Sequence, residues 1–229
     1  MLAPNEIAQR LREVRDRIAQ AASRSARSPD EVRLILASKT QPAQAIRAAY
    51  RAGARDFGEN YIQEAASKRA ELVDLSDATW HLIGHLQSNK TKLAMRTFDI
   101  IQTLDSVRLA DAIARVHPSP PMRVLIEVNL GGEESKSGVA AREVESLIEA
   151  ARAKVEILGL MTIPPPSQNA LAARKYFAEL RALRDRLAAR SGLALSELSM
   201  GMTEEFEVAI EEGATMVRVG RAVFGERPK

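Results

Sequence analysis

The chain has 229 residues, 45% of them hydrophobic, so it can bury a substantial core in one large α/β domain or two small ones. Its 33 basic residues nearly balance 30 acidic ones and only 4% are aromatic, which argues against a nucleic-acid partner. The lack of cysteine excludes disulfides, thiolate catalysis and cysteine-based metal centres. No apolar window is long enough for a membrane span and no basic segment precedes an apolar run at the N-terminus, so we expect a cytoplasmic protein with no membrane partner.

The N-terminal segment predicts one amphipathic helix, from Asn5 to about Ala22. Apolar residues recur there at spacings of four, three and four, and they are Ile7, Leu11, Val14 and Ile18. An amphipathic helix needs a surface on which to bury its apolar stripe. We therefore expect residues 1–27 to form an added helix that packs on the remainder of a single domain, residues 1–229.

After Ser28, β-rich runs alternate with helical stretches. The predicted strands are Val32–Ser38, Ala54–Gly58, Thr79–Ile83, Ile100–Leu104, Arg123–Asn129, Val155–Thr162, Leu195–Met200 and Met216–Val219. The predicted helices between them are Pro42–Ala52, Tyr61–Leu72, Asn89–Met95, Ser106–Val116, Ala140–Ala151, Asn169–Arg190 and Glu204–Glu211. Uniform β-α alternation with eight repeats predicts a single (β/α)8 TIM-type barrel, an α/β fold, with the N-terminal helix added to it.

A doubly wound dinucleotide-binding fold is the competing architecture. It would carry Gly-x-Gly-x-x-Gly after its first strand, where this chain has Ser-Lys-Thr-Gln-Pro. The strongest local breaker, residues 164–167, falls between a predicted strand and a helix, where a loop is expected. The barrel with one domain is therefore the simpler interpretation.

Lys39 stands at the end of the first predicted strand. Chemistry in a β/α barrel gathers at the carboxyl ends of the strands. A lysine at the rim of a core has an apolar stem and a desolvated amine, and desolvation makes an amine more nucleophilic. The same sequence window also suits a lysine that reaches along the surface to water.

The ends of the last two predicted strands carry glycines. Ser199 and Gly201 lie where a strand turns toward a helix, and Gly220 lets backbone approach a ligand closely. Barrels often bind phosphate at these two loops. Taken singly, the glycines also suit ordinary turns, with Thr203 as a helix cap. Together they predict a phosphorylated ligand with a carbonyl group that faces Lys39.

Strand alternation places Arg218 and Gly220 on one face and Val217 and Val219 on the other. Arg218 is therefore predicted to point into the barrel. A buried guanidinium needs acceptors, which a ligand or an acidic neighbour can supply.

Two further motifs carry less information. His81 and His85 lie four residues apart, but the second position holds no glutamate and the pair straddles a strand end, so we expect no metal site. The segment from Asn129 to Gly138 is rich in glycine but has no Gly-Lys-Ser/Thr ending, and we interpret it as a mobile loop at the barrel mouth.

Several motifs, in order along nearly the whole chain, resemble the YggS/PROSC family of pyridoxal phosphate homeostasis proteins. They are ASKTQP (37–42), FGENY (57–61), WHLIGHLQSNK (80–90), GLMTI (159–163), LSMGM (198–202) and VRVGRAVFG (217–225). The resemblance implies a barrel of the alanine racemase N-terminal type that holds pyridoxal 5′-phosphate (PLP).

Residue roles follow from this resemblance. Lys39 resembles the lysine that forms an aldimine with PLP, and Arg218 the partner of its pyridine nitrogen. The implied phosphate contacts are Ser199, Gly201 and Gly220, and Asn60 is a further candidate cofactor-binding residue. Arg221 stands where many members of the family carry threonine, so its guanidinium either replaces the hydroxyl contact to phosphate or points outward.

The resemblance implies a carrier that buffers or delivers PLP, with apo PLP-dependent enzymes as candidate recipients and no efficient catalysis. No exposed apolar stripe demands a dimer, so we expect a monomer. An arginine at the pyridine nitrogen weakens the electron sink of the cofactor. A low-activity PLP-dependent amino-acid racemase is the alternative. A third reading is a barrel enzyme that acts on a sugar phosphate or similar aldehyde through Lys39.

Overall fold

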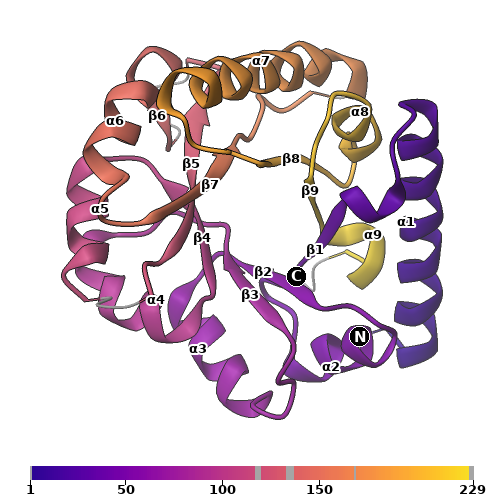
Figure 1. The fold of residues 1–229 in the computed structure, drawn as a ribbon. Helices are drawn as coiled ribbons and strands as arrows, with labels where there is room; N and C mark the ends of the chain where they lie inside the picture. Colours follow the sequence, from indigo (N-terminus) through magenta and orange to yellow (C-terminus); the bar gives the residue numbers. More distant parts are fainter. Residues whose placement is uncertain (1, 117–119, 133–136, 168, 227–229) are drawn as a thin grey trace.

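The computed structural model describes residues 2–116, 120–132, 137–167 and 169–226. Its strands are β1 (Arg33–Ala37), β2 (Asp56–Glu59), β3 (Thr79–Leu82), β4 (Ile100–Leu104), β5 (Arg123–Asn129), β6 (Val139–Ala140), β7 (Glu156–Met161), β8 (Glu197–Met202) and β9 (Met216–Val219). Eight of the nine strands in this part of the chain close into a parallel barrel in the order β1, β2, β3, β4, β5, β7, β8, β9, and β6 pairs on the outside of β5 (Figure 1). The predicted (β/α)8 barrel is confirmed.

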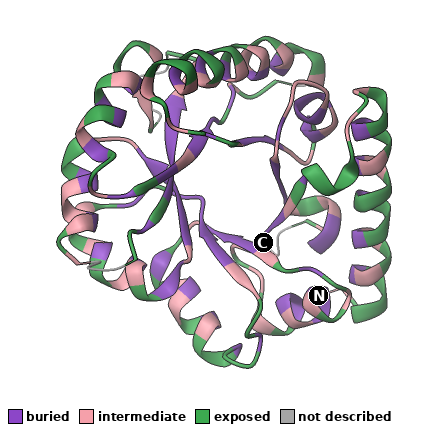
Figure 2. Cartoon of the chain, in the orientation of Figure 1, coloured by how far each residue is buried: buried purple, intermediate pink, exposed green. Residues whose placement is uncertain are grey.

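Helices surround this barrel. They are α1 (Pro4–Arg24), α2 (Ala43–Arg51), α3 (Ile62–Glu71), α4 (Thr91–Thr97), α5 (Val107–Ala114), α6 (Val144–Ala151), α7 (Arg174–Ser191), α8 (Phe206–Glu211) and α9 (Arg221–Phe224). Single turns of 3₁₀ helix lie at Pro29–Glu31, Ser88–Lys90, Ala141–Glu143 and Ala170–Ala173. The helices stand around the strands with their buried faces inward and their exposed faces outward (Figure 2). The sequence analysis missed β6 and α9, which are only two and four residues long.

Strand β8 is the strand whose predicted end differs most from the structure. It continues two residues past the predicted Met200, through Gly201 to Met202, and its pairing with β9 shifts register between Ser199 and Met202. Gly201 has φ +92°, and a Cβ there would lie 2.5 Å from the Ala209 Cβ of α8. Only glycine adopts this bulged conformation so close to another helix without strain.

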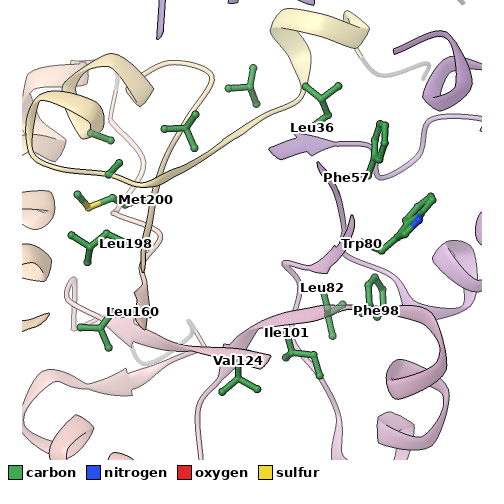
Figure 3. Close-up of a cluster of buried hydrophobic side chains, with 14 of the residues drawn as sticks. Leu36, Phe57, Trp80, Leu82, Phe98, Ile101, Val124, Leu160, Leu198 and Met200 are labelled. Atoms are coloured by element: carbon green, nitrogen blue, oxygen red, sulfur yellow. The ribbon is translucent and has the colours of Figure 1, made fainter. Parts of the chain in front are cut away.

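The core has two layers, one outside and one inside the barrel. The outer layer lies between strands and helices, and Figure 3 shows part of it as a ring of side chains that point away from the barrel axis, among them Leu36, Phe57, Trp80, Ile101, Val124, Leu160 and Leu198. The inner layer is small and consists of Ile35, Ile100, Leu125, Met161 and Met216. Alternation along each strand divides the two layers, as in other closed barrels.

The N-terminal helix packs on the barrel through α2, α8 and α9. Its buried side chains include the predicted stripe of Ile7, Leu11, Val14 and Ile18. Toward α8, the guanidinium of Arg17 lies 4.6 Å from the centre of the Phe206 ring and pairs with Glu207 at 3.1 Å. Among the helices described here, none is long and apolar enough to cross a bilayer.

Candidate functional site

Lys39 lies in the turn that follows β1, at the carboxyl end of the barrel. It is half-buried and lines a cavity of about 460 Å³, a volume typical of small-molecule sites. The next residue, Thr40, has φ +64°, a conformation that non-glycine residues rarely adopt. A backbone conformation of this kind persists only where surrounding contacts hold it.

Those contacts come from β2 and α3. The backbone N–H of Thr40 donates to Glu64 Oε1 at 2.6 Å, and the Ser38 hydroxyl donates to Glu59 Oε1 at 2.7 Å. Lys68 joins these groups, because its Nζ donates to the Ser38 carbonyl at 2.8 Å and pairs with both carboxylates, at 2.7 Å to Glu59 and 2.6 Å to Glu64. We call these four residues, Ser38, Glu59, Glu64 and Lys68, the Lys68 cluster. The cluster holds the Lys39 turn through hydrogen bonds to Ser38 before it and to Thr40 after it.

Burial dominates the electrostatics of this cluster. Glu59 is fully buried, and burial raises the pKa of its carboxyl although Lys68 and the Ser38 hydroxyl favour the charged form. Its Oε2 atom has no hydrogen-bond partner among the described residues. The positive charge of Lys68 is therefore the main group that stabilises the Glu59 carboxylate, which would otherwise be unfavourable in the core.

Another wall of the cavity comes from β9, the barrel neighbour of β1. Arg218 points inward, as strand alternation predicts, and donates to the Thr162 carbonyl at 2.9 Å and to Ser199 Oγ at 2.6 Å. Gly220 follows β9, and a Cβ there would lie 3.0 Å from the Ala37 carbonyl oxygen. Glycine at this position thus allows the end of β9 to approach the end of β1, close to Lys39.

A chain of hydrogen bonds crosses the barrel interior below Arg218. Arg218 can only donate, so Ser199 Oγ accepts from it and donates its own proton to Gln102 Oε1 at 2.6 Å. The Gln102 amide then donates to His81 Nδ1 at 3.0 Å, and His81 Nε2–H donates to Asp56 at 3.0 Å. Burial lowers the pKa of His81, which favours the neutral ring that this chain requires. This series of hydrogen bonds fixes the position of the Arg218 guanidinium.

Two buried carboxyl groups flank Arg218. Burial raises the pKa of Glu205, which lines the cavity and accepts from the Met202 N–H at 3.1 Å. Burial and the charge of Asp105 raise the pKa of Glu127 to about 7. Burial lowers the pKa of Arg218 to about 10, so this side chain stays charged at neutral pH.

The structure brings most of the predicted site residues to one cavity. Lys39, Asn60, Arg218, Gly220 and Arg221 all line it. Arg221 opens α9 and pairs with Glu204 at 2.9 Å, so it lies at the cavity rim and not on the outward face of β9 with Val219. The alternative in which Arg221 points outward with Val219 had assumed that strand alternation continues past Val219, where β9 ends.

Ser199 and Gly201 are not part of the cavity wall. Ser199 is fully buried beneath Arg218 in the series of hydrogen bonds. Gly201 lies in the bulge of β8, where the strand approaches α8 closely. Thr203, two residues beyond the bulge, lines the cavity where a hydroxyl contact was expected from Ser199. A direct phosphate contact of Ser199 or Gly201 therefore stays a prediction.

Sequence reasoning also missed Glu127 and Gln102. Inward alternation along β5 and β4 was the signal available for them, because Glu127 follows Leu125 and Gln102 follows Ile100 at a spacing of two.

His81 belongs to the same interior series of hydrogen bonds, and His85 lies 3.4 Å from Asp105 at the barrel mouth. The described part of the chain holds no group of three or more potential metal ligands. The predicted loop from Asn129 to Gly138 includes residues 133–136, which lie outside the described residues.

Glu127 is expected to make stability depend on pH. The pKa of this carboxyl rises from 4.5 to about 7 on folding, so its contribution is fully present below pH 4.5 and is lost as the pH rises through about 7. The amide of Glu127→Gln cannot ionise. We therefore expect the free energy of unfolding of this variant to rise by about 3 kcal/mol relative to that of the parent between pH 4 and pH 8. Urea unfolding at both pH values measures this difference. The exposed control Glu149→Gln should show no such gain, and parallel pH profiles of Glu127→Gln and the parent would contradict the expectation.

Known proteins are similar to this chain in both sequence and fold. The family model for the alanine racemase N-terminal domain matches residues 9–228. The pyridoxal phosphate homeostasis protein of Pseudomonas aeruginosa PAO1 is 44% identical over 225 residues, which cover 96% of each chain. That of Aquifex aeolicus VF5 is 46% identical over 223 residues, which cover 96% of this chain and 97% of the relative.

Solved structures of other proteins have the same fold as this chain. PipY of Synechococcus elongatus PCC7942, in a structure with PLP bound, is 39% identical with a TM-score of 0.85, covering 96% of this chain and 100% of PipY. Alanine racemase from Corynebacterium glutamicum is 18% identical with a TM-score of 0.74, covering 97% of this chain and 62% of the racemase, and it shows a shared fold.

The fold and the cavity define a (β/α)8-barrel protein of the alanine racemase N-terminal type, with a lysine after the first strand and an arginine on the last. Within that class, the chain belongs to the family of pyridoxal phosphate homeostasis proteins, which confirms the resemblance found in its motifs.

Proposed function

We propose that this protein binds PLP as a Schiff base on Lys39 and takes part in PLP homeostasis. The observation that carries the proposal is the placement of Lys39 and the Arg218 guanidinium in the wall of one cavity, from strands that neighbour each other in the barrel. The names of the relatives support it, as does the PLP-bound structure of PipY.

The donors of the cavity suit the parts of PLP. Thr203 supplies a hydroxyl, Gly220 lies where backbone can approach closely, and Arg221 supplies a cation, a set suited to a phosphate group. Arg218, which only donates, suits the unprotonated pyridine nitrogen. Asn60, which follows β2, lines the same cavity and offers a further polar contact.

Arg218 also limits the chemistry. Bound PLP supplies an aldehyde that condenses with amines and a pyridine ring that withdraws electrons. Arg218 remains charged at neutral pH, since its pKa is lowered only to about 10, so it disfavours a proton on a nitrogen that faces it. An unprotonated ring withdraws electrons weakly. We therefore propose a monomeric cytoplasmic carrier that buffers PLP or delivers it to apo enzymes, and not an efficient catalyst.

Titration of the pure protein with PLP tests the proposal. We expect the visible absorbance of a protonated Schiff base, and borohydride should then attach the cofactor permanently to the peptide that carries Lys39, as peptide mass analysis would show. Attachment to another lysine, or no visible absorbance, would overturn the assignment. Deuterium exchange at the α-carbon of amino acids should not exceed that of free PLP, whereas faster exchange would identify an enzyme.

A further inference from the structure

The turn that carries Lys39 has a backbone conformation that suits glycine better than the threonine it contains. Residues 38–41 form this turn, which is closed by the Gln41 N–H donating to the Ser38 carbonyl at 3.0 Å. Of its two central residues, Lys39 and Thr40, only Thr40 has a positive φ, at +64°. This pattern is that of a type II turn, whose third position favours glycine or asparagine. A β-branched residue there persists only where other contacts hold it.

Glu64 supplies one of these contacts. A type I turn differs from a type II turn mainly in the orientation of the central peptide, which here joins Lys39 to Thr40. Threonine is unstrained in a type I turn, because its φ would be about −90° there. The N–H of this central peptide donates to Glu64 Oε1 at 2.6 Å. The bond therefore stabilises the type II orientation, in which the Thr40 N–H faces α3.

Lys68 supports Glu64 in this role. Its Nζ lies 2.6 Å from the same oxygen, Glu64 Oε1, and pairs with Glu59 at 2.7 Å. It also donates to the Ser38 carbonyl at 2.8 Å, at the hydrogen-bonded end of the turn. Helix α3 thus holds the turn at two points, at Ser38 through Lys68 and at Thr40 through Glu64.

We propose that Glu64 is a positioning residue for Lys39, because it selects the peptide orientation of the turn from which the amine reaches PLP. The inference rests on the proposed Schiff base at Lys39. Without Glu64, the exposed Thr40 relaxes toward negative φ, and this rotates the central peptide and changes ψ of Lys39. PLP binding then weakens in proportion to the fraction of molecules that leave the competent orientation.

PLP titrations of Glu64 variants test this role. Glu64→Ala should weaken PLP binding at least about tenfold, since threonine is left in a strained conformation without support. Glu64→Gln should stay within about threefold of the parent, because one amide oxygen can accept from both Thr40 and Lys68, as Oε1 does. Glu71→Ala changes an exposed glutamate of the same helix and is the matched control. It should bind PLP as the parent does.

Thr40→Gly separates positioning from a general loss of structure. Glycine adopts a positive φ without strain, so the turn can keep its orientation when Glu64 is absent. In the Thr40→Gly background, Glu64→Ala should therefore weaken PLP binding by less than about threefold. A merely structural role of Glu64 predicts the same loss in both backgrounds. Circular dichroism confirms that each variant is folded.

Hydrogen exchange of the Thr40 amide gives a readout without PLP. In the full chain prepared without the cofactor, Glu64→Ala should speed this exchange at least about fivefold, because the N–H loses its acceptor. Glu71→Ala should leave the rate unchanged. Nuclear magnetic resonance resolves the single amide.

Four outcomes would overturn the proposal. They are parent-like PLP binding by folded Glu64→Ala, equal losses with threonine and with glycine at position 40, a loss in Glu64→Gln as large as in Glu64→Ala, and an unchanged exchange rate of the Thr40 amide. Failure of the proposed function looks different, because the parent itself then forms no Schiff base. The amide measurement contains no PLP and decides in either case whether Glu64 holds the turn.

Discussion

Lys39→Ala is expected to reduce the visible absorbance of the protein with PLP to that of free PLP. The reason is that the other lysine close to this turn, Lys68, cannot replace Lys39. Its Nζ is held by the Glu59 and Glu64 carboxylates and by the Ser38 carbonyl, and only 6% of the residue is exposed. A lysine amine that is held by two carboxylates and a carbonyl is not available to attack an aldehyde. Absorbance spectra of parent and variant at equal PLP concentration measure the effect.

Lys92→Ala is the control for this experiment, because Lys92 lies exposed on α4, away from the cavity. It should keep the absorbance of the parent. Lys39→Ala should also keep the unfolding midpoint of the parent within a few degrees, since Lys39 is only half-buried. An unchanged spectrum for a folded Lys39→Ala protein would show that another residue holds the cofactor.

Lys68→Met is expected to lower the free energy of unfolding by about 3–5 kcal/mol, the usual result of removing one partner from a buried ion pair. Glu59 is fully buried, and without Lys68 the Ser38 hydroxyl is the remaining hydrogen-bond donor to its carboxylate among the described residues. The Ser38 carbonyl also loses its donor from Lys68. Urea or guanidinium unfolding followed by circular dichroism measures the loss.

The double variant Glu59→Gln with Lys68→Met distinguishes charge from packing. It removes the uncompensated carboxylate, so it should be more stable than Lys68→Met alone. Lys92→Met, at an exposed position, should change stability by less than about 0.5 kcal/mol. A loss below about 1 kcal/mol in Lys68→Met would show that the Lys68 cluster contributes little to holding the Lys39 turn.

The outline of the molecule could be predicted because strand and helix periodicities are local properties. Each of the eight barrel strands overlaps a predicted run, and the N-terminal helix buries the predicted stripe. Period-two alternation along β9 also predicted that Arg218 points inward. The ends of β8 and β9 were less predictable, because the bulge at Gly201 and the start of α9 depend on contacts with Ala209 and Ala37.

By itself, the sequence determined a lysine at the end of the first strand of a parallel barrel and an inward arginine on the last. Only the tertiary structure decided which hydroxyl reaches the cavity, because the bulge of β8 buries Ser199 beneath Arg218 and brings Thr203 to the wall. It also decided the partners of the buried charges. Lys68 meets Glu59 and Glu64, whereas the Oε2 atom of Glu127 meets no donor among the described residues, since such pairings depend on how distant strands and helices pack together.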